Sequence, residues 1–372
     1  MENKNKDKVM KAHRFIVAGG GTGGHIFPAI AIANALKKIS PESKFLFVGA
    51  RGKMEMDKVP QAGYDIKGLT IAGFNRSSLI KNISLPWKLL NSFFQVAQIF
   101  KDFKPTAVIG VGGYSSFPVL RYAQTRNIPT FIHESNSFAG KANMILGKKA
   151  TKIFTAIEGM EKFFPASKIM ISGNPVRQTI SEHNTTKEEA LKHFGFSAGK
   201  KTVLSVGGSL GAKNINEAID SNIDMFEKNG LQLIWQTGKP YLDKALDRCK
   251  GKENIYVNDF ISQMEFGYAA ADIIISRSGA MAVSEICLVK KPVVFVPYPH
   301  AAEDHQTVNA QMLVNKNAAM MIKDSEALSK LVPEIIALSN DNALQQKLIN
   351  NISPLGVKNA DQVIAEAILK SC

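Results

Sequence analysis

The sequence is poor in cysteine, with three in 372 residues, and it has no long apolar run. Cys249, Cys287 and Cys372 are odd in number and too far apart for a metal-binding cluster, which favours a reduced, cytoplasmic setting over a secreted one. A membrane span requires about 18 consecutive apolar residues, and no segment reaches that length. The first fourteen residues are mostly polar, so we expect no signal peptide.

An Asp-x-Asp pair is also missing. Carboxylates usually hold the divalent cation that binds a nucleotide diphosphate, so we expect helix N-termini and arginine to neutralise any bound diphosphate instead. His300 and His305 lie near two carboxylates, but their spacing fits no tetrahedral metal site. We therefore expect no metal and no other cofactor.

Acidic residues are scarce in the first half of the chain. Residues 1–175 carry 25 Lys/Arg against 10 Asp/Glu, a net charge of +15, whereas residues 176–372 carry 21 against 22. The basic half should be drawn to a polyanion, which could be an anionic membrane surface or nucleic acid.

Strand-length apolar segments alternate with helix-like segments along the chain, which predicts an α/β protein with parallel, doubly wound sheets. Gly and Pro interrupt the pattern near 174–178, where we place a domain boundary. We predict a domain at 1–175, a second at 176–359, and a helix at 360–372 that could pack on the first. The expected strands are 14–18, 44–48, 106–110, 129–132, 151–155, 202–206, 231–235, 254–257, 272–276 and 292–296.

The segment 15–36, FIVAGGGTGGHIFPAIAIANAL, runs from a short strand through a glycine-rich loop into a helix expected at 27–38. Glycines adopt positive φ and expose backbone N–H groups, so the loop predicts a turn that binds phosphate or sugar. Pro28 suits the first turn of a helix. The positive end of the helix dipole favours a neutral His25, which could accept a proton.

The same loop fits the G-x-G-x-x-G fingerprint of dinucleotide-binding domains. Such domains carry an acidic residue after the second strand, where it binds ribose hydroxyls. Here the segment 44–48 is followed by the tripeptide GAR. This disfavours an NAD site, whereas Arg51 keeps an NADP-dependent oxidoreductase as an alternative.

Two loops of the second half have the same character. GGSLGA (207–212) follows one expected strand, and RSGA (277–280) follows another. Helix starts at the carboxyl ends of two strands predict a diphosphate site, to which Arg277 could add charge. Glu285 falls on the helix that follows and could accept hydrogen bonds from ribose hydroxyls.

The segment 79–103 has apolar residues at 79, 83, 87, 90, 94 and 97, the spacing of an amphipathic helix. After Pro86 we expect this stripe to face a core. Around and before Pro86 the apolar side chains cluster among Arg and Lys, a mixture typical of a patch at lipid headgroups. The predicted membrane patch consists of Leu79, Ile80, Ile83, Leu85 and Trp87.

Eight motifs, in this order, resemble those of MurG, the family of peptidoglycan glycosyltransferases that add N-acetylglucosamine to lipid I. They span the chain and are GGGTGGHIFPA (19–29), GVGGY (110–114), HESN (133–136), SGNPVR (172–177), GGSLGA (207–212), DFISQM (259–264), SRSGAMAVSE (276–285) and the Gln306 segment. The resemblance implies the GT-B architecture, with two Rossmann-like domains facing a cleft. It also implies inverting, metal-independent transfer from UDP-N-acetylglucosamine to the C4 hydroxyl of N-acetylmuramic acid in lipid I, giving lipid II and UDP.

The resemblance further implies the catalytic residues. His25 is the leading candidate for the base that takes the proton from the acceptor hydroxyl, and Glu134 is the reserve, either as the base or as the partner of His25. Ala282 stands where well-known members carry a hydroxyl residue, so backbone N–H groups are expected to bind the diphosphate there.

For the substrates, the resemblance implies that Ile261 contacts uracil, Ser209 reaches phosphate, and Gln306 contacts the sugar hydroxyls. The other implied substrate-binding residues are Thr22, Gly23, Gly24, Asn136, Arg177, Ala280, Met281, Ala282, Val283, Ser284 and Glu285.

The implied partners are UDP-N-acetylglucosamine, the polyprenyl-linked lipid I and an anionic membrane surface, with no nucleic acid, and cell-wall synthesis proteins could be further partners. The implied location is peripheral, on the cytoplasmic face of the inner membrane. Two alternatives stay open: a glycosyltransferase acting on diacylglycerol, and a nucleotide-sugar sensor without turnover.

Overall fold

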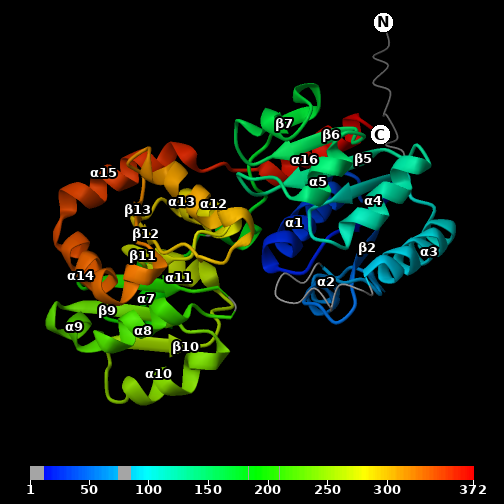
Figure 1. Ribbon diagram of the computed structural model, residues 1–372. Coiled ribbons are helices and arrows are strands. Elements are labelled where there is room, and N and C mark those ends of the chain that lie inside the picture. Colours follow the sequence, from blue (N-terminus) through cyan, green and yellow to red (C-terminus); the bar gives the residue numbers. More distant parts are fainter. Residues whose placement is uncertain (1–11, 74–84, 183, 209) are drawn as a thin grey trace, which may run out of the picture. The chain divides into compact units, whose positions relative to one another are not determined.

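The structure, a computed structural model, shows two compact units (Figure 1). The first contains the described residues up to Ser135, together with Ala139–Pro175 and Asn359–Cys372, and the second contains Asn136–Phe138 and Val176–Lys358. The described residues are 12–73, 85–182, 184–208 and 210–372.

The first unit is built on a sheet of seven described strands, and each neighbouring pair is parallel. Their order is β3-β2-β1-β4-β5-β6-β7, so β1 and β4 are neighbours although the chain visits one edge of the sheet between them. At such a switch point the loops that follow the two strands diverge and leave room for a ligand. The strands are β1 (Arg14–Ala18), β2 (Lys44–Ala50), β3 (Ile66–Leu69), β4 (Ala107–Gly110), β5 (Thr130–Glu134), β6 (Lys152–Thr155) and β7 (Ile169–Ile171).

Helices cover both faces of this sheet because successive strand residues point to opposite sides. Phe15 and Val17 belong to the core that includes α1 and α16, whereas Ile16 and Ala18 belong to the core that includes α3 and α4. The C-terminal helix α16, red in Figure 1, packs against α1. The helices are α1 (Gly23–Ile39), α2 (Glu55–Gln61), α3 (Leu85–Phe103), α4 (Ser116–Thr125), α5 (Lys141–Gly147) and α16 (Ala360–Lys370).

Helix α1 begins at Gly23, earlier than the position 27 that the sequence pattern predicts. Glycine is a weak helix former, so nothing in the pattern signals that the glycine-rich loop already contains the first turn. Pro28 therefore lies inside α1, and our prediction that it occupies the first turn was wrong.

The second unit is built on six described strands, again parallel throughout, in the order β10-β9-β8-β11-β12-β13. This arrangement makes β8 and β11 the neighbours at a second switch point. Both sheets have the Rossmann-like pattern that the sequence predicts. The strands are β8 (Lys201–Val206), β9 (Leu231–Gln236), β10 (Ile255–Asn258), β11 (Ile273–Ser276), β12 (Val293–Phe295) and β13 (Met320–Met321).

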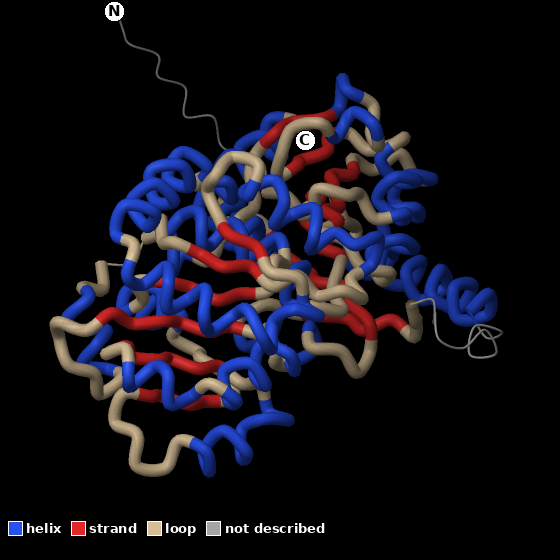
Figure 2. The backbone as a smooth tube through the Cα atoms, turned by 60° about the vertical axis from the view of Figure 1, so that its left-hand side comes forward, coloured by secondary structure: helices blue, strands red, loops and turns tan. Residues whose placement is uncertain are grey.

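In each unit the strands lie between helices, which Figure 2 shows in blue around the red strands. In the second unit one face of the sheet buries Leu204 and Ile234, and the other buries Leu233 and Trp235. The helices are α6 (Gln178–Ser181), α7 (Lys187–His193), α8 (Lys213–Ser221), α9 (Ile223–Lys228), α10 (Leu242–Arg248), α11 (Met264–Ala270), α12 (Ala280–Val289), α13 (His305–Val314), α14 (Ala327–Asn340) and α15 (Asn342–Ile352).

Candidate active site

The glycine loop (residues 19–22) connects β1 to α1 at the switch point of the first sheet. Gly20 and Gly21 have φ of 152° and 90°, values that favour glycine. A Cβ on Gly20 would overlap the carboxylate of Glu55, so any other residue there would displace that carboxylate. The loop therefore brings bare backbone to the start of α1, as expected of a ligand-binding turn.

His25 is the third residue of α1 and is half-buried. Its Nδ1 lies 3.1 Å from the carbonyl oxygen of Gly20 and 3.3 Å from Thr22 Oγ1. A carbonyl oxygen can only accept a hydrogen bond, so this contact requires the proton on Nδ1 and makes Nε2 the basic nitrogen. A Cβ on Gly112, in the loop after β4, would lie 2.8 Å from Nε2. His25 thus has the position and the tautomer that suit a general base at the switch point.

The other predicted residues of this loop form the N-terminus of α1. Thr22 is the exposed N-cap, and its carbonyl accepts hydrogen bonds from the N–H groups of His25 and Ile26. The N–H groups of Gly23 and Gly24 donate to none of the described residues. They lie at the positive end of the helix dipole and can donate to an anionic or hydroxyl oxygen.

Glu134 ends β5 and is 4% exposed. Its Oε2 accepts hydrogen bonds from the Gly140 N–H at 3.1 Å and from Asn143 Nδ2 at 2.9 Å. These contacts anchor the carboxylate at the beginning of α5, a structural role that the sequence did not suggest. They support Glu134 as a residue that orders the loop after β5.

His133, the neighbour of Glu134 in β5, is fully buried. Burial lowers its pKa to about 4, the backbone of Gly173 opposes this shift, and the charge of His25 adds to it. His133 is therefore neutral near pH 7, which keeps a second positive charge away from His25.

In the second unit, α12 begins directly after Gly279, which follows β11. The N–H groups of residues 280–282 belong to its first turn and have no acceptor within the helix. The hydroxyl of Ser284 donates to the Ala280 carbonyl at 3.0 Å, so it is directed to the helix backbone. Backbone N–H groups are thus the donors of this turn. Met281 and Val283 are half-buried and pack against the core of the second unit.

Glu285 lies on the second turn of α12 and is 7% exposed. Its Oε1 accepts from both Nε and Nη2 of Arg177 at 3.0 Å, and its Oε2 accepts from the Tyr268 hydroxyl at 3.0 Å. Burial raises the pKa of Glu285, and Arg177 opposes that shift. The structure therefore joins two residues that the sequence suggested separately. Tyr268 was missed, because its helix carries no recognisable motif.

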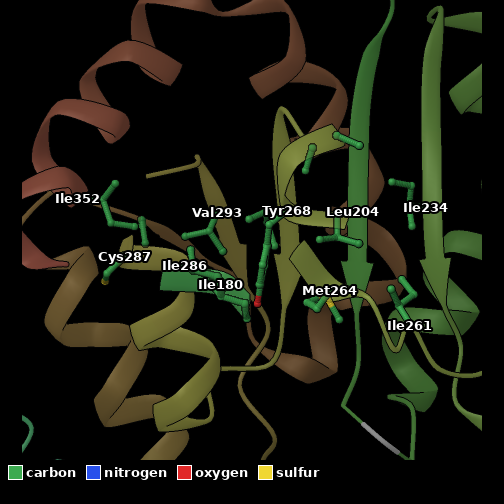
Figure 3. Close-up of a cluster of buried hydrophobic side chains, with 14 of the residues drawn as sticks. Ile180, Leu204, Ile234, Ile261, Met264, Tyr268, Ile286, Cys287, Val293 and Ile352 are labelled. Carbon is green, nitrogen blue, oxygen red and sulfur yellow. The ribbon is translucent and has the colours of Figure 1, made fainter. Parts of the chain in front are cut away.

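Ile261 is 5% exposed and belongs to the core of Leu204, Ile234 and Met264 (Figure 3). Its N–H donates to Gln236 Oε1 at 3.0 Å. Since the side chain is buried and the N–H is engaged, the carbonyl is the polar group of Ile261 that can accept a hydrogen bond from a ligand.

Gln306 is the second residue of α13 and is half-buried. Its Oε1 accepts from the Tyr298 N–H at 3.0 Å. This bond fixes the oxygen end of the side chain, so the NH₂ group is the end that can donate to a ligand. The carbonyl of Gln306 accepts from the Ser278 hydroxyl at 2.8 Å, which ties α13 to the loop before α12.

Asn136 is half-buried and starts the short segment Asn136–Phe138 of the second unit. The next residue, Ser137, donates to Asn309 Oδ1 at 2.7 Å, and Asn309 Nδ2 donates to the Ser278 carbonyl at 3.1 Å. Asn309 was not foreseen, although it connects the predicted segment to α13. Ser209 lies outside the described residues.

Arg277 was the cation that the sequence offered for a diphosphate. Its Nη1 donates to the carbonyls of Val296 and Pro297 at 2.9 and 3.0 Å and pairs with Asp324. These contacts give its charge a structural role in the loop after β12.

The exposed stripe (Trp87, Leu90 and Phe94) lies along α3, and these side chains are 75, 50 and 69% exposed. Our expectation that the apolar stripe after Pro86 faces a core was wrong. The helix packs instead through Ser92, Val96 and Phe100, which form a second line of residues at helical spacing.

An apolar pocket of about 460 Å³ lies at the start of α3. Leu85 of the predicted membrane patch lines this pocket, whereas Leu79, Ile80 and Ile83 lie outside the described residues. No helix within the described ranges is long and apolar enough to cross a membrane. The pocket is lined by Ile71, Ala72, Leu85, Pro86, Leu89, Tyr114, Phe117 and Ala142.

Two family models match the chain. The N-terminal domain of glycosyltransferase family 28 matches residues 15–155, and the C-terminal domain of the same family matches residues 202–366.

Curated proteins named UDP-N-acetylglucosamine–N-acetylmuramyl-(pentapeptide) pyrophosphoryl-undecaprenol N-acetylglucosamine transferase are similar to the chain. That of Phocaeicola vulgatus is 50% identical and covers 96% of both chains. That of Parabacteroides distasonis is 49% identical and covers 97% of this chain and 99% of its own. The crystal structure of Acinetobacter baumannii MurG superposes with a TM-score of 0.77 at 28% identity, covering 97% of this chain and 100% of that one.

Proposed function

Because this chain belongs to the MurG family of N-acetylglucosamine transferases, we propose that it transfers N-acetylglucosamine from UDP-N-acetylglucosamine to the C4 hydroxyl of N-acetylmuramic acid in lipid I. The products are lipid II and UDP. Relatives with this name match nearly the whole chain, and the two parallel sheets have the GT-B plan of glycosyltransferases. The alternative of an NADP-dependent oxidoreductase is no longer supported, because the glycine loop lies within the family 28 N-terminal domain.

The His25 geometry is the observation that carries the proposed chemistry. The acceptor hydroxyl oxygen forms a bond to the anomeric carbon as the bond from that carbon to the diphosphate oxygen breaks. UDP leaves with the electron pair, and the configuration inverts from α to β. Nε2 of His25 takes the hydroxyl proton, because the Gly20 carbonyl holds the other ring proton on Nδ1. A positioned base of this kind contributes about 10²–10⁴-fold to the rate.

The second unit supplies the donor site in this proposal. The first-turn N–H groups of α12 bind the diphosphate, and the helix dipole neutralises part of its charge without a metal. Glu285 accepts from ribose hydroxyls, because a carboxylate has lone pairs beyond those used by Arg177 and Tyr268. The remaining proposed contacts are the Ile261 carbonyl with uracil, Gln306 with the sugar, Ser209 with phosphate, and Thr22, Gly23, Gly24, Asn136 and Arg177 with the substrates.

In this proposal the apolar surface of the first unit binds the lipid part of the acceptor. The exposed stripe on α3 and the pocket beside it offer apolar area to a bilayer or a polyprenyl chain. The net charge of +15 on residues 1–175 attracts anionic headgroups. We propose a peripheral location at the cytoplasmic face of the inner membrane, with Leu79, Ile80 and Ile83 completing the patch.

A test of the base separates turnover from binding. His25→Ala should lower the transfer rate by about 10²–10⁴-fold, because the hydroxyl proton loses its acceptor. The Kd for UDP-N-acetylglucosamine should stay within about twofold, since the donor is bound by second-unit residues. Radiolabel transfer and calorimetry measure the two quantities, and His193→Ala, at an exposed histidine of α7, is the control. Turnover retained by His25→Ala would remove His25 from the role.

A test of the membrane patch uses vesicles. Replacing Trp87 and Phe94 by Ser should weaken binding to anionic vesicles more than tenfold, because each exposed ring loses about 1.5–3 kcal/mol of burial in lipid. Ile171→Ser is the control, since Ile171 is an apolar residue of β7 with 51% exposure. Unchanged binding by the folded double variant would reject the patch.

The exposed stripe would also suit a diacylglycerol acceptor, which keeps the lipid glycosyltransferase as the second candidate function. The two hypotheses share the donor and differ in the acceptor, so testing transfer to lipid I and to diacylglycerol separates them.

A further inference from the structure

Glu55 is a buried carboxylate that belongs to none of the motifs. It is the first residue of α2 and is 1% exposed. Its Oε2 accepts a hydrogen bond from the Gly21 N–H at 2.9 Å, and its Oε1 accepts one from the Ala50 N–H at 2.9 Å. Both partners are backbone groups, one in the glycine loop and the other at the end of β2. Burying a carboxylate costs free energy, so we expect Glu55 to have a structural or functional role at this position.

The contact between Glu55 and the glycine loop is a tight one. A Cβ on Gly20 would overlap the Glu55 carboxylate, and a Cβ on Gly49 would overlap its side chain. Glycine at both positions lets the carboxylate reach the loop backbone directly. Without such an anchor, a Gly-Gly peptide could rotate easily, because glycine populates many backbone conformations.

The Gly21 N–H and the Gly20 carbonyl belong to the same peptide unit. In a trans peptide these two groups point in opposite directions. Glu55 holds the N–H end, while the carbonyl end lies 3.1 Å from His25 Nδ1. The carboxylate, the peptide unit and the imidazole therefore form one hydrogen-bonded chain, and such chains polarise their members.

We propose that Glu55 is a positioning residue for His25 and acts through the Gly20–Gly21 peptide. It fixes the carbonyl that keeps the imidazole proton on Nδ1, and it strengthens that carbonyl as an acceptor. Nε2 is thereby kept as the basic nitrogen. The role is that of the carboxylate in a serine protease triad, with one peptide unit inserted between acid and histidine. The inference rests on the proposed role of His25 as the base.

Tyr114 is a titratable group near Glu55. Burial raises the pKa of Tyr114, and the negative charge of Glu55 raises it further. Tyr114 lies in the loop after β4. At the other end of the hydrogen-bonded chain, the charge of His25 lowers the pKa of His133.

The test compares the His25 tautomer and the turnover of Glu55→Gln with those of the unchanged enzyme. A glutamine has the same shape, but its NH₂ group would oppose one of the two backbone N–H groups. We expect ¹⁵N NMR at pH 8 to show the His25 proton on Nδ1 in the unchanged protein and shared between Nδ1 and Nε2 in the variant. The kcat should fall about 10–100-fold, and the Kd for UDP-N-acetylglucosamine should not change.

Two variants in the same helix are the controls. Val59→Ala removes apolar side-chain volume that is 1% exposed, so it loosens α2 and leaves the carboxylate in place. Asp57→Asn removes an exposed charge. Both should keep the Nδ1 tautomer. If Glu55→Gln does not fold, Glu55→Asp replaces it, because the shorter side chain cannot reach Gly21 and Ala50 together and should give the same shift.

A Glu55 variant that keeps the proton on Nδ1, or that loses no more turnover than Val59→Ala, would overturn the proposal. The tautomer is read without substrate. Failure of the base assignment, seen as turnover in His25→Ala, is therefore distinguishable from failure of the Glu55 inference.

Discussion

His133 gives the first unit a pH dependence that originates in one side chain. Its pKa is about 4 in the folded protein, below the unfolded value of about 6.5. Between these values the unfolded chain binds the extra proton, so the free energy of unfolding falls as the pH drops from about 6.5 towards 4. The loss is of the order of 3 kcal/mol when the full shift is counted.

A denaturant titration at several pH values measures this effect. His133→Gln should flatten the pH dependence between pH 6.5 and 4, because glutamine does not titrate in that range. His193→Gln, at an exposed position, should leave the dependence as it is. The same slope in His133→Gln and in the unchanged protein would show that another group is responsible.

The Arg177–Glu285 pair predicts a second effect at the residue scale. Removing one partner of a buried ion pair costs about 3–5 kcal/mol, and the 25% exposure of the Arg177 side chain places Arg177→Met at the lower end. Adding Glu285→Gln should restore part of the loss, because the buried charge then disappears. Urea unfolding of the single and double variants measures both. A double variant that is less stable than Arg177→Met alone would show that the loss does not come from an uncompensated Glu285 charge.

The sequence predicts residues where a local pattern marks them. His25 stands out because a glycine-rich strand-to-helix loop surrounds it. Glu55 and Tyr268 lie in ordinary helical segments, and their partners Gly21 and Glu285 come from distant parts of the chain. Such contacts depend on the way strands and helices pack, which a single sequence does not display.

At the scale of the elements, the packing of α16 against α1 supports the helix that carries His25. Ile364 and Ile368 of α16 are fully buried in the core that includes α1, the helix of His25. Ile368→Ala should lower the free energy of unfolding by about 2–5 kcal/mol, because it leaves a cavity. Gln362→Ala, at an exposed position of the same helix, should change it by less than about 0.5 kcal/mol. Equal effects of the two variants would mean that the α1–α16 contact is not a stabilising one.

The sequence predicts the long apolar strands that are followed by helices. Each expected strand is present within two residues at either end. The sequence missed β3, β7 and β13, which are short and lie at or near sheet edges. It also misplaced the start of α1, because glycine is a weak helix former and its presence does not indicate a helical turn. It misplaced the exposed face of α3, because periodicity alone does not show which apolar stripe packs inward.

At the scale of the whole molecule, the charge is unevenly divided. Residues 1–175 carry the net positive charge, and the second part of the chain is nearly neutral. Binding to anionic vesicles should weaken as salt rises, because the screening length falls from about 10 Å at 0.1 M to about 3 Å at 1 M. Binding to uncharged vesicles should be weak at every salt concentration. Sedimentation measures both, and equal binding to charged and uncharged vesicles would leave the positive charge without this role.

The acceptor distinguishes the proposed transfer reaction from the alternative lipid glycosylation. We would incubate the enzyme with radiolabelled UDP-N-acetylglucosamine, a lipid I analogue and EDTA, with diacylglycerol as the parallel acceptor. We expect label on the lipid I analogue alone, with EDTA having no effect. Label on diacylglycerol, or no transfer until a metal is added, would contradict it.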